Sequence, residues 1–346
     1  MSLTHTAYST RKLIKFGGLG IILFSFAWSF LVTGIKAYRK AHPPKLPPTV
    51  RFGKLPPITF PSKKIEKKDF VLELADDKFS EFPDSAKVYV VYRPTSTILA
   101  LEEDTKTARS LGFVTQPIKI NDGVYQFQNT TFKKTLTMNI LDGSFKLEYP
   151  YKKDQTLQGS GKLPDKNQAI DTAKAFLRTA GKLGPDLETG EQTITFWKIS
   201  FDGLHSVLSH SEANAIRVDF LRENPEKDMK IYSTKPDKSS VSVLVSNSAV
   251  ENKRIIDVDY KYSPIDRESF STYPIKSAIQ AWEELKAGDY WPAIQDSSAT
   301  VSIRNVNLAY FEPSSLTNYM QPIFVFTGDN DFTAYVPAIS SSWISE

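Results

Sequence analysis

YMQPIFVFTGDNDFTAYVPAI, residues 319–339, predicts a β-hairpin, because two runs rich in β-branched and aromatic residues flank an acidic turn that contains Gly328. Pro322 and Pro337 lie near the outer ends of the two runs, where a missing backbone N–H costs least. The two prolines therefore delimit the hairpin without breaking it.

Both faces of the first strand are apolar, since Ile323 and Val325 alternate with Phe324 and Phe326. A strand of this kind is buried on both sides. We expect one face to pack under a helix and the other to meet a neighbouring unit or a partner. Phe324, Phe326 and Tyr335 are therefore candidate partner-binding residues.

Upstream of the hairpin, one pattern occurs three times: an amphipathic helix that ends at a glycine and is followed by strands. The helices are expected at residues 97–111, 166–180 and 274–287. Asp165 and Gln168 form a capping box for the second. The predicted fold class is α+β, with two or three units that each lay a helix on an antiparallel sheet.

The composition excludes several kinds of site. The 346 residues include no cysteine, which rules out disulfides, thiolate metal sites and thiol catalysis. The formal net charge of +4 is small for this length, and no nucleic-acid partner is expected. No cofactor or metal site is predicted.

An N-terminal transmembrane helix is expected at residues 16–36, because the twenty uncharged residues between Lys15 and Lys36 match the thickness of a bilayer. A cleaved signal peptide is the alternative, although no convincing cleavage site follows. The lipid bilayer would then be a partner, and the localisation would be the cell membrane, with the bulk of the chain extracytoplasmic. The flanking basic residues leave the opposite orientation open.

Ser25, Ser29 and Thr33 recur every fourth residue and so share one helix face. Small residues at this spacing let two membrane helices approach closely, which makes the three a candidate partner-binding face. The alternative is that each hydroxyl bonds to its own backbone.

Residues 37–65 are rich in proline and predict an extended stalk. The apolar residues of VRFGKLPPITF, 50–60, also allow this segment to lie against a folded domain. The predicted organisation is a basic segment at 1–15, the transmembrane helix at 16–36, the stalk at 37–65, and α+β units at 66–150, 165–262 and 272–340.

Short motifs give no catalytic constellation. GSGKL, residues 159–163, lacks the hydroxyl residue and the distal glycine of a phosphate loop. His205 and His210 have the spacing of neither a helical nor a strand metal pair. Asp257 and Asp259 lie on one face of a strand, as expected for a solvated sheet face. The protein is therefore not expected to be an enzyme.

The C-terminal unit resembles the PepSY-like domains of the membrane-anchored YycH and YycI regulators of a bacterial histidine kinase. The resemblance rests on the Ala281–Leu285 helix, Tyr310, Gln321 with Pro322, and the closing Tyr335–Ala338. The chain is also similar to uncharacterised single-span bacterial envelope proteins. The resemblance implies binding or regulation, with no catalytic residues.

The predicted function is thus that of a non-catalytic, single-pass envelope protein whose PepSY-like domains bind or regulate another membrane or envelope protein. A homo-oligomer is also compatible with the sequence. Two alternatives remain: a structural subunit of a surface or secretion assembly, and a membrane-anchored hydrolase of peptide or cell-wall polymer. A deep cleft holding a carboxylate or histidine with a perturbed pKa would favour the hydrolase.

Overall fold

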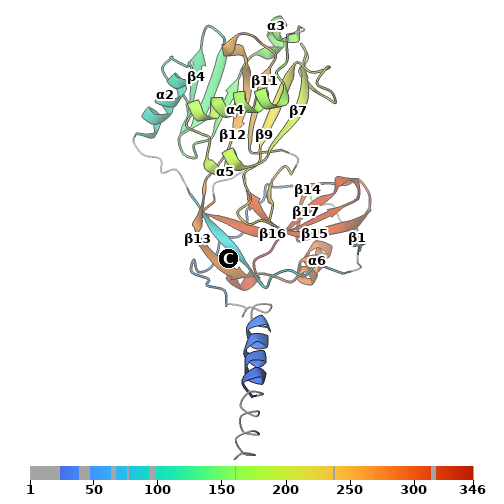
Figure 1. Cartoon of the computed structure of the whole chain (residues 1–346). Coiled ribbons are helices and arrows are strands. Elements are labelled where there is room, and N and C mark those ends of the chain that lie inside the picture. The colour runs from blue at the N-terminus through green and yellow to red at the C-terminus, as the bar shows by residue number, and fades with distance from the viewer. Residues whose placement is uncertain are drawn as a thin grey trace, which may run out of the picture. The chain divides into compact units, whose positions relative to one another are not determined.

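The computed structural model describes residues 24–38, 47–63, 68–75, 78–92, 99–159, 161–236, 238–312 and 317–345. The chain divides into two compact units, Met1–Pro48 and Thr49–Glu346. In the first unit, residues 24–38 are helical. The second unit consists mostly of β-sheet (Figure 1).

The nine-stranded sheet is antiparallel throughout and has the order β3-β4-β5-β6-β12-β11-β9-β7-β8. Its strands are β3 (Ile118–Asn121), β4 (Val124–Asn129), β5 (Lys134–Asn139), β6 (Phe145–Glu148), β7 (Gln192–Ile199), β8 (Leu204–Val207), β9 (Ala215–Phe220), β11 (Val241–Ser246) and β12 (Ile255–Tyr260).

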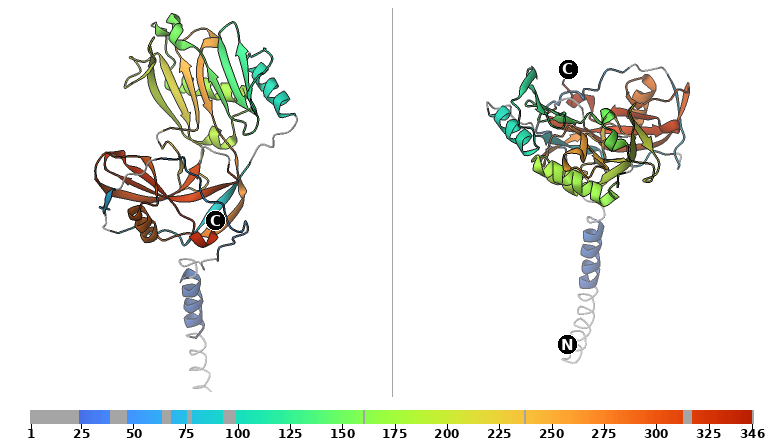
Figure 2. Two further views of the ribbon diagram at one scale, coloured as in Figure 1. Left: turned by 180° about the vertical axis from the view of Figure 1, so that it is seen from behind. Right: turned by 90° about the horizontal axis from the view of Figure 1, so that it is seen from above.

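Helices α2 (Ala100–Ser110) and α4 (Lys166–Thr179) lie on one face of this sheet, and α5 (Pro185–Thr189) lies near its lower end in Figure 1. The capping box of Asp165 and Gln168 is present at the start of α4. From behind, the strands lie in front of α4 (Figure 2, left), and α3 (Gln155–Gln158) packs over one end of that second face through the buried Leu157. The main core of the sheet therefore lies under α2 and α4.

The eight-stranded sheet has the order β1-β15-β16-β17-β14, with β2 paired to β13 and β16 and with β10 paired to β15. Its strands are β1 (Asp69–Leu72), β2 (Ser85–Val91), β10 (Ile231–Ser233), β13 (Ile265–Pro274), β14 (Trp291–Ile294), β15 (Thr300–Glu312), β16 (Tyr319–Gly328) and β17 (Thr333–Pro337). β1 and β10 run parallel to β15, and the other pairs are antiparallel.

Helix α6 (Ala278–Ala287) packs on one face of this sheet and begins with a capping box of Ser277 and Gln280. It starts four residues later than expected because Pro274 still belongs to β13. Single-turn 3-10 helices occur at η1 (Tyr151–Lys153), η2 (Glu251–Lys253), η3 (Asp329–Asp331) and η4 (Ser341–Trp343).

The predicted hairpin is formed by β16 and β17, with Ile323 opposite Pro337. Along one edge of β16, Tyr319 and Met320 pair with β2, and the residues from Ile323 onward pair with β17. Pro322 lies between these two stretches, so its missing N–H interrupts neither the β2–β16 nor the β16–β17 ladder. Its carbonyl oxygen accepts from the N–H of Ala338 at 3.1 Å. The two prolines thus mark the ends of the β16–β17 ladder.

The expected α+β fold with an N-terminal transmembrane helix is wrong. Among the described residues, no helix combines the length and the apolar character needed to cross a membrane. Residues 16–23 of the expected span lie outside the described part of the chain.

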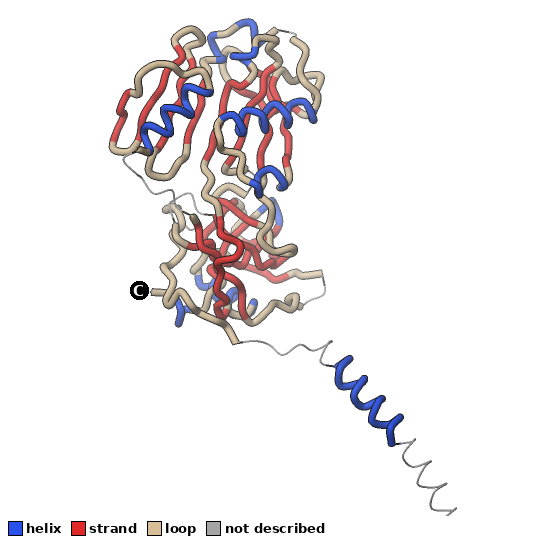
Figure 3. Tube along the Cα trace, turned by 60° about the vertical axis from the view of Figure 1, so that its left-hand side comes forward, coloured by secondary structure: helices blue, strands red, loops and turns tan. Residues whose placement is uncertain are grey.

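The expected arrangement as two or three separate helix-on-sheet units is wrong as well. Strands from 66–150 and from 165–262 join in one sheet, because β6 pairs with β12. Strand β2 leaves its expected unit and pairs with β13 and β16. The tube view in Figure 3 shows the two resulting groups of strands with their few helices. Pairings across the chain, rather than local units, therefore define the fold.

Candidate binding groove on the eight-stranded sheet

A cluster of aromatic side chains covers the face of the β16–β17 hairpin that points away from α6. Trp291, Phe311 and Tyr335 lie there around the fully buried Ile323 and Val325. The rings are tilted against one another at 34–60°, and the cluster is apolar except for polar atoms such as the N–H donor of the Trp291 indole. It has the chemistry of a surface that holds an extended chain.

The chain's own proline-rich segment occupies this surface. We call residues 56–63 the strap. The ring of Phe60 stacks on that of Trp291 with centroids 5.4 Å apart and an interplanar angle of 7°. It also contacts the ring of Phe311 at 4.8 Å. Of the two possibilities for the predicted stalk, the described residues 49–63 therefore follow the second, in which the segment lies against a folded domain.

Two side chains of the sheet donate hydrogen bonds to carbonyl oxygens of the strap. Trp291 Nε1 donates to the Pro61 oxygen at 2.9 Å, and Gln321 Nε2 donates to the Pro56 oxygen at 2.8 Å. Proline lacks an N–H but keeps its carbonyl, so these donors suit a proline-rich chain. Aromatic grooves that recognise polyproline segments combine the same elements.

A lysine of the strap makes the reverse contact. Lys63 Nζ donates to the carbonyl oxygens of Pro292 and Ala293 at 2.6 and 2.9 Å. The amine also lies 5.4 Å from the centroid of the Trp291 ring, within cation–π range. Partial burial lowers the pKa of Lys63. This end of the strap is therefore held by both backbone and ring contacts.

The residues just before the strap anchor it firmly. Leu55 is fully buried, its N–H donates to the Trp343 oxygen at 2.8 Å, and its carbonyl accepts from the Ser345 N–H at 2.8 Å. Tyr273 Oη donates to the Gly53 oxygen at 2.9 Å and accepts from the Phe52 N–H at 3.0 Å. The segment before residue 56 is thus integrated into the sheet, whereas the strap rests on its surface.

A pocket of about 360 Å³ opens beside the strap. Its walls come from the strap (Pro57, Ile58, Phe60), from the end of the hairpin (Pro337, Ile339) and from Ile344. Gln321 also lines it. The volume is in the range of small-molecule sites, and the walls are mostly apolar.

The predicted partner-binding residues of the hairpin are all buried. Phe324 and Phe326 are fully buried in the core beneath α6, where the Phe326 ring lies 6.2 Å from that of Trp282. Tyr335 is fully buried in the aromatic cluster, and its hydroxyl donates to the Ser233 oxygen at 3.1 Å. Helix α6 covers Phe324 and Phe326, and the strap covers Tyr335.

The predicted face of Ser25, Ser29 and Thr33 lies on the helical residues 24–38. Thr33 Oγ1 donates to the Ser29 carbonyl oxygen at 2.6 Å. For Thr33 the alternative thus holds, in which the hydroxyl bonds to its own backbone.

The sequence did not point to Trp291, Gln321 and Phe60 as site residues. The sequence marked Gln321 only as one of the residues that carry the family resemblance, and Phe60 only as part of an apolar run. The signal that was available is the pairing of an aromatic-rich sheet with a proline-rich segment elsewhere in one chain. Their encounter depends on tertiary contacts more than 200 residues apart in sequence.

The histidines form no catalytic constellation among the described residues. His205 contacts Asp202 at 3.0 Å and His210 contacts the Pro164 oxygen at 2.9 Å, and both side chains are exposed. The described residues also contain no group of three or more histidine, aspartate or glutamate side chains that could hold a metal ion. Gly161, Lys162 and Leu163 of GSGKL line an open pocket of about 820 Å³ together with residues of the Ser246–Arg254 segment.

Burial raises the pKa of several carboxylates, among them Asp104, Asp219 and Asp257. Burial, reinforced by the neighbouring Asp259, raises the pKa of Asp257 to about 6. Asp257 lies opposite Glu148 in the β6–β12 ladder and opposite Leu244 in the β11–β12 ladder. Asp257 lines none of the described pockets of about 340, 360 and 820 Å³. The raised pKa therefore reflects mainly burial, with a smaller contribution from the neighbouring Asp259.

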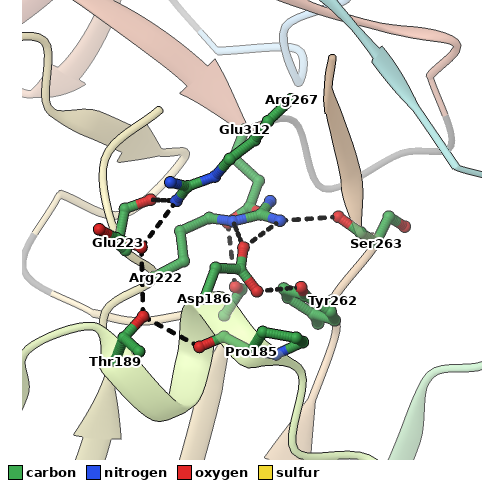
Figure 4. A network of polar contacts seen from close by, with 10 residues as sticks. Pro185, Asp186, Thr189, Arg222, Glu223, Tyr262, Ser263, Arg267 and Glu312 are labelled. Atoms are coloured by element: carbon green, nitrogen blue, oxygen red, sulfur yellow. Dashed lines mark hydrogen bonds and ion pairs between the residues drawn. The ribbon is translucent and has the colours of Figure 1, made fainter. Parts of the chain in front are cut away.

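A buried arginine links the two sheets (Figure 4). Arg222 follows β9 of the nine-stranded sheet and donates to Asp186 Oδ2 at 2.8 and 3.0 Å and to the Ser263 oxygen at 3.0 Å. It also donates to Glu312 Oε1, at the end of β15 in the eight-stranded sheet, at 2.7 Å. The hydroxyl of Tyr262 donates to the other oxygen of Asp186.

The cluster around Arg222 has a structural role. Burial alone would lower the pKa of Arg222, but the carboxylates of Glu312 and Asp186 raise it, so the guanidinium stays charged. The guanidinium also lies 4.6 Å from the centroid of the Tyr262 ring. A pocket of about 340 Å³ borders the cluster, but four donated bonds to the protein already occupy Arg222. It is a poor substrate contact and a strong internal link.

Comparison with known proteins gives no family. No protein-family model matches the chain, and no curated protein matches it. Among solved structures, an uncharacterised protein from Eubacterium rectale ATCC 33656 is similar, with 10% sequence identity and a TM-score of 0.41 over 78% of this chain and 87% of that chain. The resemblance to PepSY-like domains stays a prediction.

Proposed function

We propose that this protein is a non-catalytic binding protein that controls another protein by holding an extended, proline-containing segment on the aromatic face of its eight-stranded sheet. The observation that supports this proposal is the pair of hydrogen bonds from Trp291 and Gln321 to carbonyl oxygens of the strap. The face therefore has the donors and the rings that bind such a chain, and the strap is an example of an occupant.

The recognition would use carbonyl oxygens and one aromatic anchor. A proline-rich chain loses little conformational entropy on binding, and its carbonyls remain free to accept hydrogen bonds. Phe60 supplies the anchor through its stack on Trp291. A partner segment with an aromatic residue one position before a proline, as in Phe60–Pro61, would make the same contacts.

Occupation by the strap would make binding conditional. A tethered segment acts at an effective concentration in about the millimolar range. A partner at lower concentration must therefore bind the aromatic face more tightly than the strap does, or bind when the strap is already displaced. The groove would then respond to partners that release the strap. This is the behaviour of a regulator, in line with the function expected from the sequence.

A peptide in trans tests the proposal. The peptide KLPPITFPSK, residues 54–63, is titrated into the full-length wild type and into Phe60→Ala, and the Trp291 indole N–H is followed by NMR. We expect the peptide to bind Phe60→Ala at least tenfold more tightly than the wild type, because the variant's own strap competes less well. Thr59→Ala, which changes an exposed strap residue, is the matched control and should behave as the wild type.

A second peptide supplies the specificity control. Replacement of the phenylalanine by alanine in the peptide should weaken its binding to both proteins, because the stack on Trp291 is lost. If the original peptide bound neither protein, or shifted resonances away from Trp291, the groove would not be a peptide site.

A further inference from the structure

Helix α2 packs on the nine-stranded sheet through few side chains (Figure 1). Of its eleven residues, two are buried, Asp104 and Ala108, whereas α4 on the same face of the sheet buries three apolar residues. Leu101 and the C-cap Leu111 are partly buried. The fully buried part of α2 is therefore one alanine and one carboxyl group, which gives the helix little hydrophobic stabilisation.

The first turn of α2 is not capped by a side chain. Leu99 occupies the N-cap and makes no side-chain hydrogen bond, whereas α4 and α6 begin with capping boxes. A helix of eleven residues is marginal in water on its own. The stability of α2 therefore depends on its docking to the sheet.

The buried carboxyl group opposes that docking. Asp104 is 9% exposed, and its Oδ2 atom is sealed from solvent without a hydrogen-bond partner. Burial raises the pKa of Asp104, while Lys182 opposes this shift and Glu103 adds to it. A charge buried without a hydrogen bond is costly, and a protonated carboxyl group in the same place costs less.

A lysine on the same sheet face does not change its charge over the acidic range. Lys134 alternates with the buried Leu136 and Met138 along β5 and is 7% exposed. Burial lowers the pKa of Lys134 to about 8, so the amine stays largely protonated from pH 4 to pH 7. Over this range a change in the docking of α2 can be assigned to carboxyl groups.

We propose that α2 is a pH-sensitive lid over β4 and β5, closed when Asp104 is protonated and loosened when it is ionised. Opening would uncover Phe127, Leu136 and Met138, which belong to the same core as Ala108. The docked state binds the proton more tightly than the open state does. Docking is therefore most favourable below about pH 4 and weakens as the pH rises through the raised pKa of Asp104.

Hydrogen exchange tests the lid in the full-length protein. The exchange of the Ala108 amide is followed by NMR between pH 4 and pH 7 and corrected for the intrinsic rate, with the Ala173 amide of α4 as the internal reference. Because undocked α2 cannot keep its hydrogen bonds, exchange reports opening. We expect the protection of Ala108 relative to Ala173 to fall by about three- to tenfold over this range.

Two variants assign the pH dependence. Asp104→Asn keeps the shape of the side chain but cannot ionise, so it should remove the fall and raise the protection of Ala108 at pH 7 by about threefold or more. Glu103→Gln is the matched control, because Glu103 is the exposed neighbour on the same helix. It should retain the pH dependence of the wild type.

The lack of cysteine permits a second measurement. Ala108→Cys introduces a single thiol on the inner side of α2, and Ala173→Cys introduces a matched thiol on the inner side of α4, since both alanines are fully buried. At pH 7 a thiol reagent should label Ala108→Cys about tenfold or more faster than Ala173→Cys. Addition of Asp104→Asn to Ala108→Cys should slow the labelling about threefold or more.

Equal relative protection of Ala108 at pH 4 and pH 7 would overturn the proposal. So would a pH dependence that survives Asp104→Asn or is lost in Glu103→Gln, or labelling of Ala108→Cys as slow as that of Ala173→Cys. If Asp104→Asn fails to fold, the wild-type exchange profile and the two thiols still decide. Peptide binding at the groove is measured separately, so either proposal can fail alone.

Discussion

Single side chains carry most of the specificity of the groove. Trp291 combines a stacking surface with a donor, and Gln321 separates its amide into a satisfied nitrogen and an unsatisfied oxygen. Neither role depends on charge. At this scale the contacts that hold the strap depend on ring stacking and on backbone carbonyls.

Trp291→Phe tests the donor apart from the stack. The change keeps an aromatic ring against Phe60 but removes the hydrogen bond to Pro61, so the strap should be less stable by about 0.5–1.5 kcal/mol. Cleavage by trypsin after Lys63, the last residue of the strap, should then be about two- to tenfold faster. Trp197→Phe, which removes an indole bond to the exposed Thr195, should leave this rate unchanged. Equal cleavage rates of wild type and Trp291→Phe would contradict the role of the donor.

Asp257 should make the protein less stable as the pH rises. Its pKa is about 6 in the folded state, mainly because of burial, and about 3.9 when unfolded. The folded state therefore binds the proton more tightly, so the contribution of this group is most favourable below about pH 4 and is lost as the pH rises through 6.

Asp257→Asn removes this dependence. Relative to the wild type, the variant should gain on the order of 1–2 kcal/mol between about pH 4 and pH 7.5, measured by urea unfolding. Asp228→Asn, at an exposed position, should show no such gain. A constant difference between Asp257→Asn and wild type across this range would show that the carboxylate is not perturbed.

At the scale of elements, caps and strands follow local rules more closely than the strap does. Helix α4 begins at a capping box that the sequence already indicates, and β16 and β17 form the hairpin expected from residues 319–339. No local sequence signal of this kind predicts where the strap lies. Its composition permits an extended spacer and a docked segment equally, and Trp291 decides between them.

Asp165→Ala should weaken helix α4 at its first turn. The Asp165 side chain accepts from the Gln168 N–H at 2.9 Å, and its loss leaves that donor unsatisfied. We expect the free energy of unfolding to fall by about 0.5–2 kcal/mol in urea titrations. Asp171→Ala, at an exposed position within the same helix, should change stability by less than about 0.5 kcal/mol. Equal effects of the two substitutions would argue against the cap.

At the scale of the whole second unit, the pairing of distant strands was the part that the sequence could not predict. A period of two identifies a strand and its faces but does not identify its neighbour. β2 pairs with β13, which lies more than 170 residues further along, and β1 pairs with β15. The helix-and-strand succession therefore suggested local units, whereas long-range ladders form two sheets.

Arg222 provides the strongest test at this scale. Arg222→Met leaves Asp186 and Glu312 buried without their cation, which should lower the free energy of unfolding by about 3–5 kcal/mol. Arg178→Met breaks an exposed pair with Glu188 and should cost less than about 1 kcal/mol. Adding Glu312→Leu to Arg222→Met should recover part of the loss. A small cost for Arg222→Met in urea unfolding would show that the cluster does not link the sheets.

The contact of Leu55 with the C-terminal residues closes the second unit on itself. Leu55 and Ile344 form a parallel bridge, and the N–H of Ser345 donates to the Leu55 oxygen. The two ends of the folded chain are thus neighbours, which is the arrangement that favours circular permutation. Under tension applied at residues 49 and 345, the hydrogen bonds of Thr49 and Val50 to Thr272 at one end and the Ser345–Leu55 bond at the other would be loaded first, and the strap would peel away only after these contacts open.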